Sequence, residues 1–211
     1  MSTNFPSSLD NTTSQKVTDG SSIIVAALPN NMLDMIGALQ AKVGANASSV
    51  QSSIDFFMRK NYVKVSDVKS VAGGGAFYAG AWRRRDLNTE DHDAGGLCSL
   101  SGNQLTLAAG TYRCQISCPG WSVEKHVARL YDVTGDTELL RGTSERSEIS
   151  SDASQTRSII CGQFTVAENH SLEIQHYCTH SDGYGFGKGM SGFITDNVYT
   201  VAEFWRIPES R

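Results

Sequence analysis

The first patterned stretch of the chain has an apolar residue at every third or fourth position, which is the spacing of one face of an α-helix. The apolar positions are Leu28, Met32, Met35, Leu39, Val43, Ala47, Val50, Ile54 and Phe57. Gly44 falls where a helix C-cap is expected, and Ser48 with Gln51 forms a capping-box pattern. The pattern therefore predicts two short helices, near residues 30–43 and 48–61.

Neither predicted helix is long enough to be stable alone in water, so the apolar stripe needs a partner. The rest of the chain has no second amphipathic stretch of this kind. We therefore expect the helices to self-associate, with the stalk contacts formed by Leu28, Met32, Met35, Leu39, Val43, Val50, Ile54 and Phe57. The alternatives are packing against the β domain of the same chain or against another protein.

After residue 75 the helical spacing gives way to strict alternation. In Thr111–Cys118 the residues Tyr112, Cys114, Ile116 and Cys118 share one face, and Ser171–Cys178 alternates in the same way. Further strands are predicted at 76–84, 104–108, 123–133, 137–141, 157–166 and 194–207, separated by turn-rich pieces such as Ser101–Asn103 and Thr134–Asp136.

About eight short strands without helices between them predict a mainly β protein, an antiparallel jelly-roll sandwich. We expect the chain to be organised as an N-terminal arm (1–22), a helical stalk or anchor (23–63), a glycine-rich junction (64–75) and the jelly-roll head (76–211). The arm is almost entirely polar and cannot form a core of its own, so it is a flexible tail or an arm that becomes ordered only against a partner.

Several segments of the head together resemble a known family. They are Arg84–Thr89, Leu105–Tyr112, His126–Tyr131 and Glu203–Trp205. In order and spacing they resemble the trimeric jelly-roll heads, similar to those of the complement and tumour-necrosis-factor superfamily, found on bacteriophage fibres and virion surface proteins. The segments Asn4–Asp10, Leu39–Gly44 and Ser52–Asp55 also look like the leading part of phage virion fibre proteins.

The resemblance implies a homotrimer on the virion surface, attached to capsid or tail proteins through its N-terminal segment, with heads that bind a host-surface glycan or protein. One alternative is a capsid head fibre or decoration protein with a mainly structural role. A second alternative is a polysaccharide-degrading enzyme, although the sequence has neither a repetitive β-helix pattern nor a prominent pair of carboxylates.

The composition of the chain limits the kinds of partner that we expect. A formal net charge of −4 gives no overall attraction to nucleic acid, and the apolar run Ile23–Leu28 is too short to insert into a membrane. Five cysteines scattered over 211 residues indicate free thiols and synthesis in a reducing host cytoplasm.

The clearest candidate for ligand binding is the glycine-rich segment 182–189. Its glycines permit tight backbone turns, so Tyr184, Phe186 and Lys188 are predicted to project from a loop, and exposed aromatic side chains suit binding of sugar or protein. We expect no catalytic residue, no cofactor and no metal.

Two other clusters of residues have both a functional and an ordinary structural interpretation. His176, Cys178 and His180 have zinc-binding chemistry, but cysteine is commonly a small core residue. The triplet Arg83–Arg85 lies close in sequence to the acidic residues Glu90, Asp91 and Asp93, which predicts that these charges satisfy each other, within one chain or between subunits.

Overall fold

The computed structural model describes residues 27–44, 53, 54, 56, 60–70, 73–190, 192 and 195–207. It divides the chain into two units, Met1–Lys60 and Asn61–Arg211. The second unit, which contains all the strands formed by the described residues, is the head. None of the helices formed by the described residues is long and apolar enough to cross a membrane.

The first unit contains the helix α1, Ala27–Val43, which confirms the first predicted helix. Gly44 ends it as predicted: its φ of 85° lies in the left-handed region, and its N–H donates to the Gln40 carbonyl at 2.8 Å. Most of the predicted second helix, including Val50 and Phe57, lies outside the described residues.

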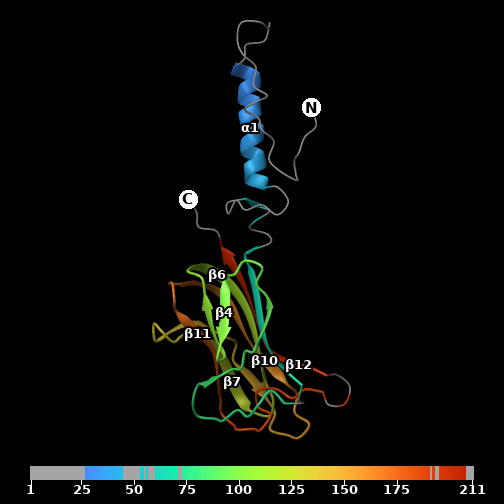
Figure 1. Cartoon of the computed structure of the whole chain (residues 1–211). Helices are drawn as coiled ribbons and strands as arrows, with labels where there is room; N and C mark the ends of the chain where they lie inside the picture. The colour runs from blue at the N-terminus through green and yellow to red at the C-terminus, as the bar shows by residue number, and fades with distance from the viewer. Residues whose placement is uncertain are drawn as a thin grey trace. The chain divides into compact units, whose positions relative to one another are not determined.

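The described residues of the head form twelve strands in two antiparallel sheets (Figure 1). One sheet has the order β10-β6-β12-β1-β3, formed by Thr156–Val166, Gly110–Gly120, Asn197–Ile207, Tyr62–Lys69 and Thr89–His92. The other has the order β4-β5-β11-β7-β8, formed by Cys98–Ser101, Gln104–Leu107, Ser171–Cys178, Glu124–Asp132 and Thr137–Arg141. Two short strands join this second sheet at its sides: β2, Arg83–Arg84, pairs with β11, and β9, Glu145–Ser147, pairs with β7.

The strand pairing is nested, as in a long hairpin rolled into a sandwich. β1 pairs with β12, β5 with β11, β6 with β10, and β7 with β8. Successive pairs alternate between the two sheets, which is the topology of a jelly roll. The predicted fold class, an antiparallel jelly-roll sandwich, is therefore confirmed.

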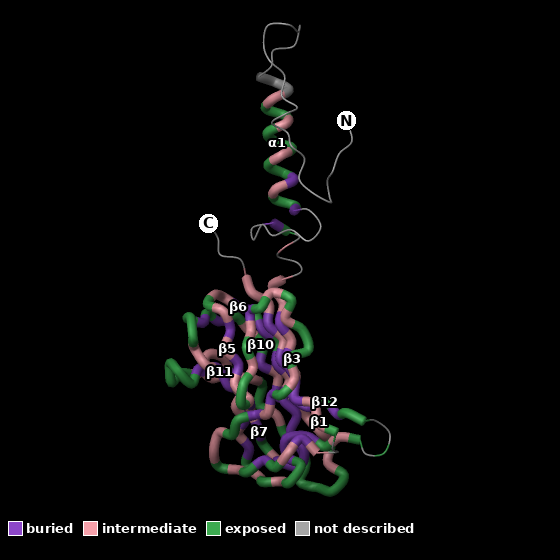
Figure 2. The backbone as a smooth tube through the Cα atoms, viewed as in Figure 1, coloured by how far each residue is buried: buried purple, intermediate pink, exposed green. Residues whose placement is uncertain are grey.

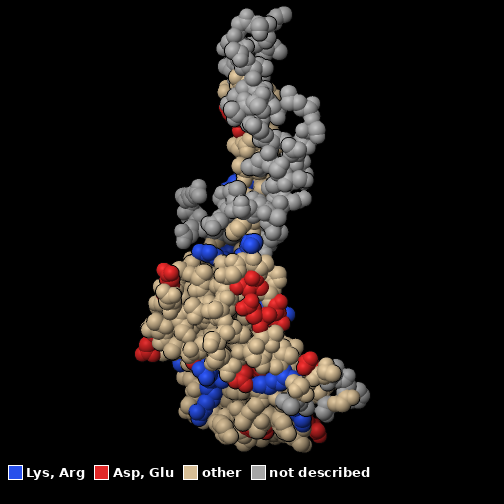
Figure 3. Space-filling model, viewed as in Figure 1, with Lys and Arg blue, Asp and Glu red and all other residues tan. Residues whose placement is uncertain are grey.

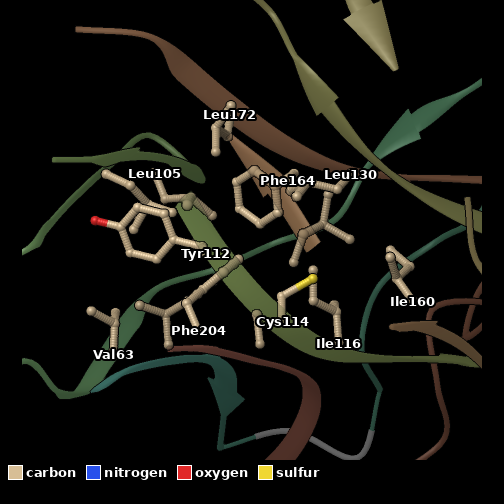
Figure 4. Close-up of a cluster of buried hydrophobic side chains, with 14 of the residues drawn as sticks. Val63, Leu105, Tyr112, Cys114, Ile116, Leu130, Ile160, Phe164, Leu172 and Phe204 are labelled. Carbon is tan, nitrogen blue, oxygen red and sulfur yellow. The ribbon is translucent and has the colours of Figure 1, made fainter. Parts of the chain in front are cut away.

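The core lies between the sheets and follows the alternation read from the sequence (Figures 2 and 4). On β6 the inward residues Tyr112, Cys114 and Ile116 are completely buried, because every second side chain of a strand points to the same face. The rings of Tyr112 and Phe164 stack with centroids 5.9 Å apart, and Phe204 meets Phe164 edge-on at 6.2 Å. The neighbouring strands β10, β6 and β12 thus contribute interlocking side chains to one core.

Two boundaries predicted from the sequence are wrong. Residues 64–69 belong to strand β1, whose Val63 and Val65 are completely buried, so the head begins before the predicted junction. The predicted strand at 76–84 is reduced to the two residues of β2, because Gly80 adopts a positive φ of 85° and interrupts the extended backbone. The strands β1, β3, β4 and β9 were not predicted.

The glycines Gly73–Gly75 do not form a free hinge but lie against the head. The Gly74 carbonyl accepts a 2.6 Å hydrogen bond from Lys69 Nζ, which also reaches the carboxylates of Asp67 and Asp86 at 3.0 and 2.7 Å. The Gly74 N–H donates to the Gly187 carbonyl at 2.8 Å. The segment thereby becomes part of the surface that supports the candidate site.

Candidate functional site

The predicted 182–189 loop lies between β11 and β12 and is held by backbone hydrogen bonds on several sides. Asp182 forms an antiparallel bridge with Phe77, and Lys188 forms one with Gly73. The Gly185 carbonyl accepts from the Trp121 N–H at 3.1 Å. The loop is therefore a fixed surface, built where three segments distant in sequence come together.

Tyr184 and Lys188 project from this loop as predicted. The Tyr184 side chain is 50% exposed. Lys188 Nζ lies 4.2 Å from the ring centroid of Trp121, and the Tyr184 ring meets the same indole edge-on at 6.2 Å. Trp121 itself is buried and its indole N–H donates to the Ala153 carbonyl at 3.0 Å. The tryptophan beneath these two side chains was missed in the sequence.

Phe186 contradicts the prediction that it projects. Its side chain is 7% exposed and belongs to a small hydrophobic cluster with Phe77, Val123 and Cys178. The Phe77 and Phe186 rings lie 4.6 Å apart. Phe186 faces inward because it anchors the loop to the head, which leaves Tyr184 and Lys188 as the exposed pair.

A glycine pair in this loop offers a matched test of its packing. A Cβ on Gly185 would lie 2.6 Å from Phe77 Cβ and 2.8 Å from Val123 Cγ1, whereas a Cβ on Gly183 would meet nothing within 4 Å. We expect Gly185→Ala to lower the free energy of unfolding by about 1–3 kcal/mol, and Gly183→Ala to leave it within about 1 kcal/mol. Urea unfolding of both variants measures the difference, and equal effects would contradict the packing described.

Beneath the loop lies a completely buried arginine, Arg85, with four hydrogen-bond partners. Its guanidinium donates to Phe186 O at 2.8 Å, Pro119 O at 2.9 Å, Thr200 Oγ1 at 2.8 Å and His176 Nδ1 at 3.3 Å. Its Cζ also lies 4.3 Å from the Phe186 ring centroid. The side chain therefore ties the loop to β6, β12 and β11.

Burial lowers the pKa of Arg85 to about 10, so the group still carries its charge at neutral pH. Among the described residues, none of the hydrogen-bond acceptors of this guanidinium is a carboxylate. A buried cation is costly unless it is fully hydrogen-bonded, which explains why four acceptors converge on it.

Two buried histidines continue the chain of hydrogen bonds from Arg85. Since arginine can only donate, His176 Nδ1 is the acceptor, and its other nitrogen, Nε2, therefore donates to His126 Nδ1 at 3.0 Å. His126 Nε2 in turn donates to Thr156 Oγ1 at 2.8 Å. Burial, reinforced by the Arg85 charge, lowers the pKa of His176 well below its usual value, and burial lowers the pKa of His126 to about 4. Both imidazoles are neutral at pH 7.

Within the described residues of one chain the arginine triplet does not pair with the nearby acidic residues, which was one of the two predicted arrangements; pairing between subunits stays a prediction. Within the chain, Arg83 Nε donates to the Tyr78 carbonyl, Arg84 pairs with Glu173 at 3.3 Å, and Arg85 is buried as described. In the part of the chain that the structure describes, none of the three pairs with the acidic residues at 90–93. Distant parts of the chain supply the partners of Arg84 and Arg85, whereas Arg83 donates to a carbonyl five residues earlier.

The five cysteines are unpaired thiols, and burial raises the pKa of Cys178 to about 12. Cys178 Sγ donates to the His180 carbonyl at 3.2 Å. No group of three or more His, Cys, Asp or Glu side chains among the described residues is arranged to hold a metal ion. His176 and Cys178 instead pack inside the head.

Comparison with known proteins gives structural neighbours only. No protein-family model matches the chain, and no curated protein matches it in sequence. The globular domain of a zebrafish complement 1qA protein is 14% identical, with 72% of this chain and 99% of that chain covered and a TM-score of 0.46. Murine APRIL, crystallised at pH 8.0, is 10% identical, with 70% and 98% covered and a TM-score of 0.44. The assignment of a jelly roll rests on the strand pairing described above.

Proposed function

We propose that this chain is a non-enzymatic, trimeric fibre or spike of a bacteriophage virion, made in the host cytoplasm and displayed on the particle surface. Its N-terminal segment anchors it to a capsid or tail protein, and its head binds a ligand on the host surface. The single observation that carries the proposal is the exposed apolar stripe of α1, whose large side chains are left uncovered by the described residues of a single chain.

The stripe consists of the large apolar side chains that the helical spacing places on one face. In the single chain Met32 is 58% exposed, Met35 72%, Leu39 64% and Val43 37%. Burying such a side chain contributes about 1.5–3 kcal/mol, so these four residues are a strong incentive for association. Three copies packed along this stripe form the stalk that the family resemblance implies.

The head fits a binding role because it presents a fixed surface with projecting side chains. Tyr184 supplies an aromatic ring and a hydroxyl, and Lys188 supplies a cation, both held over Trp121. A ligand that meets a rigid surface loses less conformational entropy than one that must order a flexible loop. Three such surfaces on one particle component multiply a weak contact into firm attachment.

The alternative function, a capsid head fibre or decoration protein with a mainly structural role, uses the same anchor but needs no ligand. Imaging of particles with an antibody to the head separates attachment at the capsid from attachment at the tail. The second alternative is a polysaccharide-degrading enzyme. Release of reducing sugar from host polysaccharide would support this enzyme and contradict the proposal.

Adsorption to host cells tests the binding function directly. We expect labelled full-length protein to bind the host, and the double variant Tyr184→Ala/Lys188→Ala to bind at least about tenfold more weakly, which corresponds to about 1.4 kcal/mol. Gly183→Ala, which changes the same loop without a new contact, serves as the matched control. Absence of binding by the unaltered protein would favour the structural alternative.

A further inference from the structure

A second surface of the head places three arginines in one row across four strands. Gln175 on β11 lies opposite Arg84 of β2 on one side and Arg129 of β7 on the other, and Arg129 lies opposite Arg141 of β8. Residues directly opposite across antiparallel strands project from the same face. We call Arg84, Gln175, Arg129 and Arg141 the arginine row.

The row lies on the outer face of its sheet, away from the core. The residues that alternate with it, Ile174, Ala128 and Leu130, are completely buried, so the row must point outward. The outermost side chains are well exposed, at 43% for Arg84 and 53% for Arg141. With strands about 4.8 Å apart, the three intervals between β2 and β8 separate the ends of the row by about 14 Å.

Aromatic side chains hold the centre of the row in place. The Arg129 Cζ lies 4.1 Å from the ring centroid of Trp82 and 4.2 Å from that of Tyr131, and its Nε and Nη2 donate to Gln175 Oε1 at 3.0 and 2.7 Å. Arg141 Cζ lies 5.2 Å from the same Trp82 ring. Tyr177 meets Trp82 edge-on at 5.8 Å. Two guanidinium groups and three partly exposed aromatic rings thus form one continuous surface.

The charges of this surface do not balance. The described ion pairs of the row involve two carboxylates: Glu173 faces Arg84, and Glu138 is shared by Arg129 and Arg141. Hydrogen bonding from Arg141 lowers the pKa of Glu138, so this carboxylate is already ionised. These ion pairs set three cations against two anions, although like charges directly opposite on neighbouring strands destabilise a sheet. A further carboxylate, Asp136, accepts the Tyr131 hydroxyl beside the row.

The formal net charge of the chain is −4, so this positive excess is local to the row. On the face in view in Figure 3, an acidic patch high on the head lies apart from the basic patches lower down, where basic and acidic side chains adjoin one another. A sheet surface on which arginines lie opposite one another on neighbouring strands is suited to a negatively charged ligand.

We propose that the arginine row binds an acidic glycan, a saccharide chain that carries carboxylates. A guanidinium donates strong charge-assisted hydrogen bonds to a carboxylate, and Arg84 and Arg141 are the exposed guanidinium groups at the ends of the row. Arg141 Nε and Nη2 already donate to Glu138, so the remaining N–H groups of Arg141 face the glycan. Tyr131 and Tyr177 offer ring surface to the sugar. Nucleic acid fits less well, because its affinity depends on many phosphate contacts and the excess charge here is small.

This inference rests on the proposed binding function and names a ligand class for a second surface of the head. It does not involve Tyr184 or Lys188. Loss of host adsorption in the loop variants with glycan binding intact would separate the two surfaces.

The test measures binding of full-length protein to immobilised polygalacturonate, with neutral dextran and a single-stranded oligonucleotide as comparison probes. We expect binding to polygalacturonate alone, weakened by salt and reduced about tenfold by Arg84→Gln or Arg141→Gln, since each loses one charged contact of about 1.4 kcal/mol. Arg113→Gln, which removes an exposed arginine from β6 on the other sheet, is the matched control and should bind normally.

Each contrary result has a defined meaning. Equal binding to dextran, or binding that survives Arg84→Gln/Arg141→Gln, would overturn the assignment of the row. Equal binding to the oligonucleotide would show a general polyanion surface and overturn the assignment to a glycan. Thermal unfolding of every variant verifies that the head is folded. Adsorption to the host without any binding to polygalacturonate would refute this inference and leave the proposed function standing.

Discussion

Replacing Arg85 by methionine should lower the free energy of unfolding of the head by about 4 kcal/mol, because removing one member of a buried charged network leaves its partners unsatisfied. Methionine fills similar space but donates nothing to Phe186 O, Pro119 O or Thr200 Oγ1. Urea unfolding followed by tryptophan fluorescence measures the change, since Trp82, Trp121 and Trp205 all lie in the head.

The neighbouring residue supplies the control for this experiment. Arg84→Met removes the same functional group from a partly exposed ion pair with Glu173, and such pairs contribute up to about 1 kcal/mol. Similar losses in the two variants would contradict the role assigned to Arg85. A second readout is the 182–189 loop itself: without its anchor at Phe186, the loop should become susceptible to proteolysis before the sheets unfold.

Acid should destabilise the head because His126 and His176 are held neutral beside a permanent cation. The pKa of His126 falls from 6.5 to about 4 on folding, mainly through burial, so below pH 6.5 the unfolded chain binds more protons than the folded one. Stability therefore decreases as the pH falls from 6.5 to about 4. His126 alone contributes a loss of about 3 kcal/mol over this range, and His176, whose pKa is lowered in the same direction, adds to it.

The surrounding charges do not remove this effect. Glu145 on β9 favours protonation of His126, whereas Arg85 opposes protonation of both histidines. His126→Gln should therefore flatten the dependence of the urea midpoint on pH between 6.5 and 4. An unchanged slope in His126→Gln would show that other groups dominate the acid response.

Strands with one buried face could be predicted from the sequence, because burial of one face makes apolar and polar residues alternate along the strand. The predictions at 104–108, 111–118, 137–141, 157–166 and 171–178 coincide with β5, β6, β8, β10 and β11 to within a few residues. The turn predicted at Ser101–Asn103 is also present. Gly102 and Asn103 both adopt the positive φ that a two-residue hairpin loop requires. Local sequence therefore determined most of the jelly roll.

β1 was missed although its sequence alternates. Val63 and Val65 point inward and alternate with the less buried Tyr62 and Lys64. The strand was nevertheless missed because it lies shortly before the glycines at 73–75, which resembled a linker. Its place in the sheet depends on pairing with β12, more than a hundred residues away. The alternation of polar and apolar residues from Tyr62 to Val65 could have identified this strand.

The candidate site was predicted only in part, because its support comes from residues distant in sequence. Nothing in Arg83–Arg85 distinguishes the arginine that is buried from the two that are exposed. Arg85 is buried because Pro119, Phe186 and Thr200 bring oxygen acceptors to it from three other parts of the chain. For the same reason Phe186 faces inward while Tyr184, two residues earlier, is exposed.

Association of three chains through α1 is the central claim of the proposed function, and the native mass of the full-length protein tests this association. Light scattering during size-exclusion chromatography should give three times the chain mass of 22.8 kDa at micromolar concentration. Because Met35 and Leu39 lie exposed on the stripe, Met35→Glu/Leu39→Glu should shift this mass to that of a single chain while the head remains folded. A mass of 22.8 kDa for the unaltered protein would contradict the trimeric fibre.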